Sequence, residues 1–163
     1  MHKIGIVSDT HSFIDEKLFI FLKNCDIVFH AGDIGDINVY DKLSTKFKVY
    51  AVYGNIDNYT IRDFINETVL TKIENVNILM THIGGYPNKY VPKYRKKIEK
   101  FKPNIVITGH SHILKVIFDK KLNHLHINPG AYGKSGFHKI RTAIRLIIDG
   151  AEIKDLEILE IDR

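Results

Sequence analysis

Short apolar runs alternate with amphipathic segments over the first third of the chain. Three of the runs, at residues 3–8, 27–33 and 48–55, have the length and composition of buried β-strands. The segments between them, 15–24 and 37–47, have the apolar spacing of helices. Strands that alternate with helices in this way predict a parallel sheet with helices on its faces.

The pattern changes after residue 55, where most segments have the character of strands. A helix is predicted only near residues 90–101, and Glu74-Asn75, Asn123 and Gly150 mark turns. The predicted strands lie at 64–73, 76–81, 104–110, 115–120, 122–128, 141–149 and 152–161. We expect these strands to be mostly antiparallel and to form a second sheet that packs on the first.

The composition is that of a globular protein with one substantial core. With 163 residues, of which 44% are hydrophobic and 26% charged, we expect a single domain over residues 1–163. Cys25 is the only cysteine, which excludes an intrachain disulfide and predicts a packed thiol in a reducing compartment. The N-terminal apolar run is too short for a signal peptide or a membrane span, so we expect a cytoplasmic protein without a membrane partner.

The formal net charge of +5 suits acidic or phosphorylated ligands but does not by itself identify one. Much of the excess lies in lysine-rich residues 93–102. No aromatic stacking platform accompanies that stretch, so it predicts a solvated helix face and does not favour nucleic acid as a partner.

Seven side chains with oxygen or nitrogen donors stand at or just after the ends of predicted strands. They are Asp9, His11, Asp33, Asn55, His82, His110 and His112. The carboxyl ends of strands in an α/β sheet open onto one edge, so these side chains can converge there. Seven ligands exceed what one ion usually takes and predict two. The mixture of carboxylate, amide and imidazole suits manganese, iron, zinc, cobalt or nickel better than magnesium or calcium.

The blocks D-x-H, G-D, G-N, x-H and G-H-x-H follow one another between Asp9 and the INPG segment at 127–130. This order resembles the calcineurin-like metallophosphoesterases, and within them the small bacterial and archaeal phosphodiesterases. The resemblance implies an α/β fold, a four-layer α-β-β-α sandwich in which two mixed sheets are flanked by helices.

The resemblance also implies how the seven ligands divide between two metal ions. The first ion would be held by Asp9, His11 and His112. The second would be held by Asn55, His82 and His110. Asp33 would bridge both ions.

The activity implied by the resemblance is that of a metal-dependent hydrolase, most directly a phosphodiesterase acting on a small phosphodiester. Its cofactors would be two divalent transition-metal ions, manganese first, with iron, zinc, nickel or cobalt as alternatives. Such a pair acidifies a bridging water, clamps phosphate oxygens and neutralises transition-state charge, and the resulting hydroxide attacks phosphorus in line. Asp33, Asn55 and His110 would take part in catalysis, and Asn55 would also contact the substrate.

The chain departs from the family pattern at two positions. Many members have histidine as a general acid in the block G-N-H, where this chain has Ile56. A positioned acid supplies about 10²–10⁴-fold, although the phosphodiesterase subfamily often lacks this histidine. The other departure is Ser12, where the family usually has glycine.

The glycine-rich segment 128–139 has two interpretations. It is either a surface loop or a loop beside the metals whose Tyr132, Lys134 or His138 touches the substrate. His138 is also the first candidate to protonate the leaving group in place of the missing histidine.

Several other polar residues have structural and functional interpretations. His30 is expected to bond to the backbone, or to support the metal ligands from behind. His124 and His126 lie two apart in a predicted strand and face one side, which favours cross-strand packing or exposure to solvent over a functional role. Asp57 either orients its neighbours or caps a turn.

Two other functions compete with a phosphodiesterase. The retromer subunit of this fold is a protein-interaction scaffold that has lost part of the ligand set, whereas this chain keeps all seven. A nuclease would need a nucleic-acid groove or an added specificity domain, for which the chain has no room. A homo-oligomer remains open.

Overall fold

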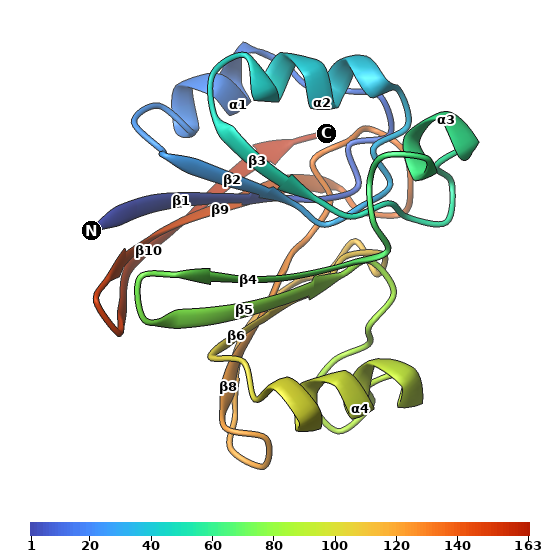
Figure 1. The fold of residues 1–163 in the computed structure, drawn as a ribbon. Helices are drawn as coiled ribbons and strands as arrows, with labels where there is room; N and C mark the ends of the chain where they lie inside the picture. Colours follow the sequence, from blue (N-terminus) through green and yellow to red (C-terminus); the bar gives the residue numbers. More distant parts are fainter.

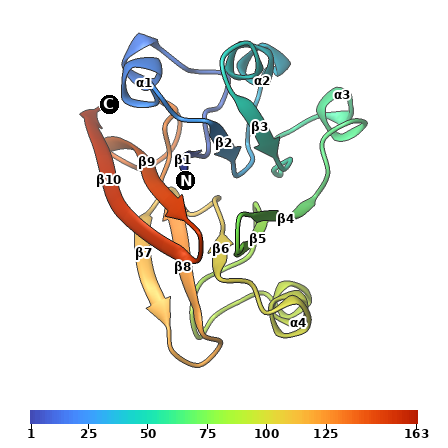
Figure 2. The same cartoon turned by 60° about the vertical axis from the view of Figure 1, so that its left-hand side comes forward.

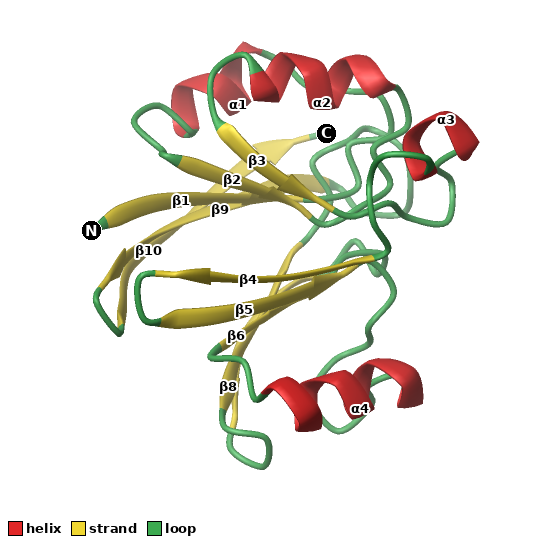
Figure 3. Ribbon diagram, viewed as in Figure 1, coloured by secondary structure: helices red, strands yellow, loops and turns green.

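The computed structural model describes residues 1–163 as two facing β-sheets between outer helices (Figures 1 and 3). Helices α1 (Glu16–Phe21) and α2 (Ile37–Ser44) cover the outer face of the first sheet, and α4 (Pro92–Phe101) covers the second. This arrangement confirms the predicted four-layer α-β-β-α sandwich.

The first sheet has the strand order β10-β9-β1-β2-β3. Its strands are β1 (His2–Val7), β2 (Ile27–His30), β3 (Lys48–Ala51), β9 (Ile140–Asp149) and β10 (Glu152–Asp162). β1, β2 and β3 are parallel, as their alternation with helices predicts, and β9 pairs antiparallel with β1.

The second sheet has the strand order β4-β5-β6-β8-β7. Its strands are β4 (Thr68–Ile73), β5 (Val76–Thr81), β6 (Ile105–Ile107), β7 (Leu114–Asp119) and β8 (His124–Pro129). β5, β6 and β8 are parallel, and β4 and β7 pair antiparallel at the edges.

The prediction that the second half forms its own, mostly antiparallel sheet is therefore wrong in two respects. The β9–β10 hairpin joins the first sheet, and the centre of the second sheet is parallel because α4 carries the chain back across it. A strand's apolar pattern shows that its faces are buried but does not show which sheet its edge will complete.

The core lies mainly between the two sheets. Alternate residues of β1, β2, β5 and β6, such as Ile6, Phe29, Met80 and Ile107, point into this layer, as the two-residue period of a strand requires. A second cluster packs α1 and α2 on the first sheet, and Tyr94 and Ile98 of α4 pack on the second. Figure 2 shows that α4 lies over the β4–β5 side of its sheet and leaves β7 uncovered.

Side-chain caps fix where the helices start. Asp15 and Asp36 accept hydrogen bonds from backbone N–H groups of α1 and α2. Asn58 caps α3 (Tyr59–Arg62), a single turn that the sequence pattern did not predict because it is too short to show periodicity. No helix is long and apolar enough to cross a membrane.

Two of the sequence-based expectations outside the site are confirmed. Cys25 is buried, and that burial raises the pKa of its thiol to about 11. In α4 only Tyr94 and Ile98 are buried, so the lysine-rich stretch is a solvated helix face, as expected.

Candidate metal centre

The loops that follow the carboxyl ends of β1, β2, β3, β5 and β6 meet at one edge of the sandwich. In Figure 1 these loops gather on the right, opposite the N-terminus. Because parallel strands end on the same side, residues from five separate segments converge there. The structure thus brings together side chains that are up to 103 positions apart, Asp9 and His112.

The first group of donors consists of Asp9, His11 and His112, whose ligand atoms all lie within 4.8 Å of one another. Asp9 Oδ1 lies 3.1 Å from His112 Nε2 and 4.0 Å from His11 Nε2. These three residues are the set that the resemblance assigns to the first metal.

The second group consists of Asp33, His82 and His110, again with ligand atoms within 4.8 Å. Asn55 adds its side-chain oxygen, which lies 3.1 Å from His82 Nε2. The group therefore contains the set assigned to the second metal, together with Asp33.

Asp33 stands between the two groups and presents a different oxygen to each. Its Oδ2 lies 3.6 Å from His11 Nε2 of the first group, and its Oδ1 lies 3.2 Å from His82 Nε2 of the second. This position is the one that a bridging carboxylate needs.

Two buried polar atoms at the centre have no hydrogen-bond partner, Asp9 Oδ1 and His11 Nε2. The other oxygen of Asp9 accepts bonds from the Ser8 hydroxyl at 2.6 Å and the His110 backbone N–H at 3.1 Å. Buried polar groups without partners are costly, and a cation would satisfy both atoms at once. The residues present therefore fit a metal ion.

The backbone at the ligands is strained. Five of the seven have positive φ angles, with Asp9 at 51°, His11 at 45°, Asp33 at 52°, His110 at 68° and His112 at 58°. Each non-glycine residue in this region costs about 1–2 kcal/mol. Such strain persists where the surrounding structure holds the chain in place, and it is concentrated at functional sites.

A glycine precedes three of the ligands because the loops approach one another too closely for a side chain. A Cβ on Gly54 would overlap the carboxylate and backbone nitrogen of Asp33. A Cβ on Gly109 would overlap the Ser8 hydroxyl and crowd the Asp9 carboxylate. The G-D, G-N and G-H blocks are thus a requirement of packing around the centre.

Asp57 ties together the loops that carry Asp33 and Asn55. Its carboxylate, 3% exposed, accepts hydrogen bonds from three backbone N–H groups, those of Ile34 at 3.1 Å, Gly35 at 2.8 Å and Gly54 at 2.7 Å. This geometry decides in favour of the orienting role that the sequence left open.

Arg62, which sequence reasoning missed, holds the same turn from outside. Its guanidinium donates to the backbone carbonyls of Gly54, Asn55 and Asp57. It lies on α3, so only the unpredicted helix could have drawn attention to it.

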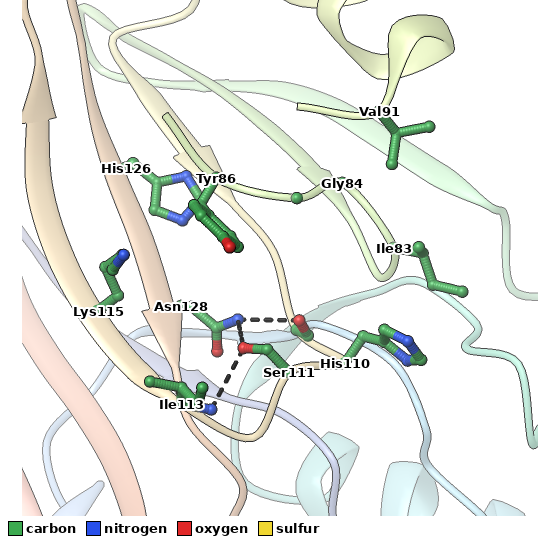
Figure 4. A pocket seen from close by; sticks show the side chains of 12 residues that line it. Ile83, Gly84, Tyr86, Val91, His110, Ser111, Ile113, Lys115, His126 and Asn128 are labelled. Carbon is green, nitrogen blue, oxygen red and sulfur yellow. Dashed lines mark hydrogen bonds between the residues drawn. The ribbon is translucent and has the colours of Figure 1, made fainter. Parts of the chain in front are cut away.

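Asn128 in the INPG segment fixes the loop that carries His110 and His112. Its side-chain nitrogen donates to the Gly109 carbonyl at 2.8 Å and to the Ser111 hydroxyl oxygen at 3.1 Å (Figure 4). The family block around Asn128 thus acts on two ligands through the backbone.

His138 contacts His112 and the backbone of Gly133. Its Nε2 is 2.8 Å from the Gly133 carbonyl, so this nitrogen carries the proton and Nδ1 can accept one. His112 Nδ1, 3.2 Å away, then donates to it and leaves His112 Nε2 free for a metal. Both ring nitrogens of His138 are engaged in these contacts, and its roles as a substrate contact and as the proton donor stay predictions.

Tyr132 and Lys134, the other two expected substrate contacts, lie in different surroundings. Tyr132 is fully buried, and its hydroxyl donates to Asp15 at 2.6 Å, so no part of it is free for a substrate. Lys134 is exposed with its ammonium 4.4 Å from the Phe13 ring centroid, and its contact with substrate stays a prediction.

Asp33 and His82 are electrostatically coupled in the metal-free protein. Burial opposes the charge of Asp33, but the hydrogen bond and charge of His82 outweigh it and lower the pKa of the carboxyl. Burial opposes protonation of His82, yet Asp33 and Asp9 together raise the pKa of its imidazole. A metal ion held here by His82 would compete with a proton for the same ring nitrogen.

His30 lies beneath the centre and has a structural role. Its Nδ1 accepts from the Gly32 N–H at 3.2 Å, and its Nε2 is 2.9 Å from the Thr10 hydroxyl. Burial lowers the pKa of His30 to about 4, so the ring is neutral. The expected backbone hydrogen bond is confirmed.

Known proteins are similar to this chain in sequence or in architecture. A protein of Methanothermobacter thermautotrophicus named "Probable metallophosphoesterase" is 29% identical over 136 residues, which cover 78% of this chain and 76% of that protein. An archaeal phosphodiesterase structure superposes with a TM-score of 0.73 at 22% identity, over 98% of this chain and 99% of the other. Vps29 of Entamoeba histolytica complexed with zinc has a TM-score of 0.74 at 21% identity, over 98% of both chains.

The structural likenesses show the fold, and a family model identifies the chain more directly. The model of the calcineurin-like phosphoesterase superfamily domain matches residues 2–151, a span that includes all seven ligands. This protein therefore belongs to the calcineurin-like phosphoesterase superfamily.

Proposed function

We propose that the protein is a dimetal phosphodiesterase that hydrolyses a small phosphodiester in the cytoplasm. The observation that supports this most strongly is the pair of ligand groups with Asp33 between them, its two oxygens directed to opposite sides. The archaeal phosphodiesterase among the structural relatives supports a diester as the substrate class.

Two bound divalent ions would supply an activated water and positive charge for the phosphate. The protein's part is to place the donors. Five neutral ligands, one amide and four imidazoles, accompany only two carboxylates, so positive charge is left for an anionic substrate. Asn55 and His110 are exposed at the mouth of the centre, where a phosphate oxygen can reach them.

Ile56 stands where other members have a histidine, and its side chain is 45% exposed. Its backbone N–H donates to Asp33 Oδ1 at 3.1 Å, so the residue helps to orient the bridging carboxylate. Its hydrocarbon side chain can donate no proton, and the ring nitrogens of His138, the other candidate, both have partners. The activity should therefore favour leaving groups that depart as stable anions.

The test combines metal content with turnover. After reconstitution with Mn²⁺, elemental analysis should approach two ions per chain, and activated aryl diesters should be hydrolysed. Asp33→Ala should lose more metal than Asp9→Ala or Asn55→Ala, because Asp33 presents a separate oxygen to each group. Equal losses from all three variants, or a firm stoichiometry of one ion, would argue against the bridging role.

A non-catalytic scaffold is the second candidate, and the Vps29 structures among the neighbours favour it. The orphaned atoms Asp9 Oδ1 and His11 Nε2 are explained equally well by a structural metal. Full occupancy by two ions without hydrolysis of any diester would support the scaffold and refute the phosphodiesterase.

A further inference from the structure

A cavity of about 250 Å³ opens beside His110, on the outer face of the second sheet (Figure 4). Its walls come from the loop after β5, from the loop between β6 and β7, and from β7 and β8. Because His110 belongs to both the metal centre and this cavity, a phosphate bound at the centre would have its ester group at the cavity mouth.

The mouth of the cavity is apolar although it adjoins a charged centre. Ile83, Tyr86, Val91 and Ile113 all line it, and all four are classed among the exposed large hydrophobic side chains of the protein. Exposed apolar side chains that gather around one cavity mark a binding site more often than chance exposure does. Lys115 lies over the Tyr86 ring, with its ammonium 4.5 Å from the centroid, and adds positive charge to the wall.

The inner end of the cavity has a polar atom without a partner. His126 is fully buried, its Nδ1 is 3.0 Å from the Tyr90 hydroxyl, and its Nε2 has no hydrogen bond. Figure 4 shows its ring at the cavity wall above Asn128, with one nitrogen directed into the space. Burial lowers the pKa of His126 to about 4, so the ring is neutral at pH 7.

The Tyr90 hydroxyl fixes what His126 can offer. The same oxygen is 2.8 Å from His124 Nε2, and a hydroxyl has one hydrogen, so it donates to one imidazole and accepts from the other. In either arrangement His126 Nε2 faces the cavity with one unmet hydrogen bond, as donor or as acceptor.

The spacing of residues along β8 indicates how far His126 Nε2 lies from the loop that carries His110. Asn128 bonds to the Gly109 carbonyl next to His110, and His126 lies two residues further along the strand. Two residues of a strand span roughly 7 Å. The polar end of the cavity is therefore about one aromatic ring away from the loop that carries the metal ligand.

We propose that this cavity binds the organic group of the phosphoester, and that the group is a flat aromatic ring with a hydrogen-bonding atom on the edge away from the phosphate. Apolar walls and the Tyr86 ring suit a π-face, and His126 Nε2 suits the polar edge. The volume is below the usual range for drug-sized ligands, about 300–1,000 Å³, which favours one ring system over an oligomer. A nucleobase and a substituted phenyl ring share this chemistry.

The inference rests on the proposed function, but binding tests it without turnover. The Mn²⁺-loaded protein is titrated calorimetrically with methyl phosphate, phenyl phosphate, 4-carbamoylphenyl phosphate and uridine 5′-monophosphate. At least one of the two ligands with a polar-edged ring should bind about tenfold or more tightly than methyl phosphate. Whichever of those two ligands binds more tightly shows whether the ring is a nucleobase or a substituted phenyl group.

Variants of the wall locate the effect. Tyr86→Ala should reduce the advantage of the aromatic ligands over methyl phosphate by about fivefold or more. Tyr59→Ala is the matched control, because Tyr59 is exposed on α3 and does not line the cavity.

His126→Phe should abolish the preference for a polar-edged ring over phenyl phosphate. His124→Phe is its control, since it removes a bond to the same Tyr90 hydroxyl outside the cavity. If His126→Phe does not fold, the result with Tyr86→Ala decides.

Two results would overturn the assignment of the cavity: equal affinity for methyl and aromatic phosphates, or an aromatic advantage unchanged by Tyr86→Ala. The proposed function fails separately. Aromatic preference without hydrolysis of any diester would refute the activity alone, and hydrolysis without aromatic preference would refute the cavity alone.

Discussion

Removing the carboxylate of Asp57 should loosen the metal centre although Asp57 binds no metal. Three backbone N–H groups donate to this side chain, from the loops that carry Asp33 and Asn55; those of Ile34 and Gly54 are buried, and that of Gly35 is partly buried. A buried donor left without a partner costs about 1–3 kcal/mol. Asp57→Ala should therefore lower the free energy of unfolding of the metal-free protein by roughly 4 kcal/mol, somewhat below the sum because water can enter from the exposed side of the turn.

Asp57→Asn gives a graded version of the same test. Oδ2 accepts two of the N–H groups and Oδ1 accepts one, so an amide can keep the first pair and must turn its own NH₂ toward Gly35. We expect a loss of roughly 2 kcal/mol, smaller than that of the alanine variant. Because the two loops are released, Mn²⁺ affinity should fall about 10–100-fold in both variants.

The assays are urea unfolding without metal, which separates stability from ligand binding, and calorimetric titration with Mn²⁺. Asp36→Ala is the control: Asp36 accepts one exposed backbone bond, at the start of α2, and its loss should cost about 1 kcal/mol with metal affinity unchanged. The reasoning is refuted if Asp57→Ala costs no more than this control and binds Mn²⁺ as tightly as the native protein.

Three further predictions follow from the same geometry. Ile56→His should speed hydrolysis of diesters with basic leaving groups, by about tenfold or more for the poorest, so that the rate depends less steeply on leaving-group pKa; an already flat dependence in the native protein would contradict this. Gly54→Ala should push Asp33 aside and weaken Mn²⁺ binding at least about tenfold, whereas Gly150→Ala, with nothing near its Cβ, should cost only about 1 kcal/mol of stability. His30 and His126 have folded-state pKa values lowered to about 4 from 6.5. The unfolded chain therefore takes up protons first as the pH falls, so the free energy of unfolding is highest above pH 6.5 and decreases as the pH falls toward 4. Each imidazole contributes roughly 3 kcal/mol to that loss; urea unfolding at pH 7.5 and 4.5 measures it, and an equal drop in His126→Phe would show that His126 contributes nothing.

The sequence by itself determined the chemistry of the centre. Apolar runs that end in Asp9, Asp33, Asn55, His82 and His110 predict strands whose carboxyl ends carry ligands, and the structure places these residues at one edge. This succeeds because strand patterns and ligand types are local properties, and because parallel strands leave few alternatives for where their ends lie.

The hydrophobic pattern of a strand could not predict which sheet the strand joins, because that depends on the strand it pairs with. β9 and β10 look the same in sequence whether they complete the first sheet or the second, and only the packing of the two layers decides between them. The one-turn helix α3, and with it the clamp of Arg62 on the 54–57 turn, is too short to leave a periodic signal.

The tertiary structure alone decided which polar residues face the site and which support it. Tyr132 and His138 lie in the same glycine-rich segment as Lys134, yet one is buried against Asp15 and the other is bonded to His112. Composition cannot separate these cases, because the direction of each side chain depends on a residue far away in the sequence, Asp15 for Tyr132 and His112 for His138. Contacts with distant residues also turn Asp57 toward the N–H groups of Ile34 and Gly35 and place His126 at the wall of a cavity with one nitrogen unpaired, and no local rule of sequence specifies either.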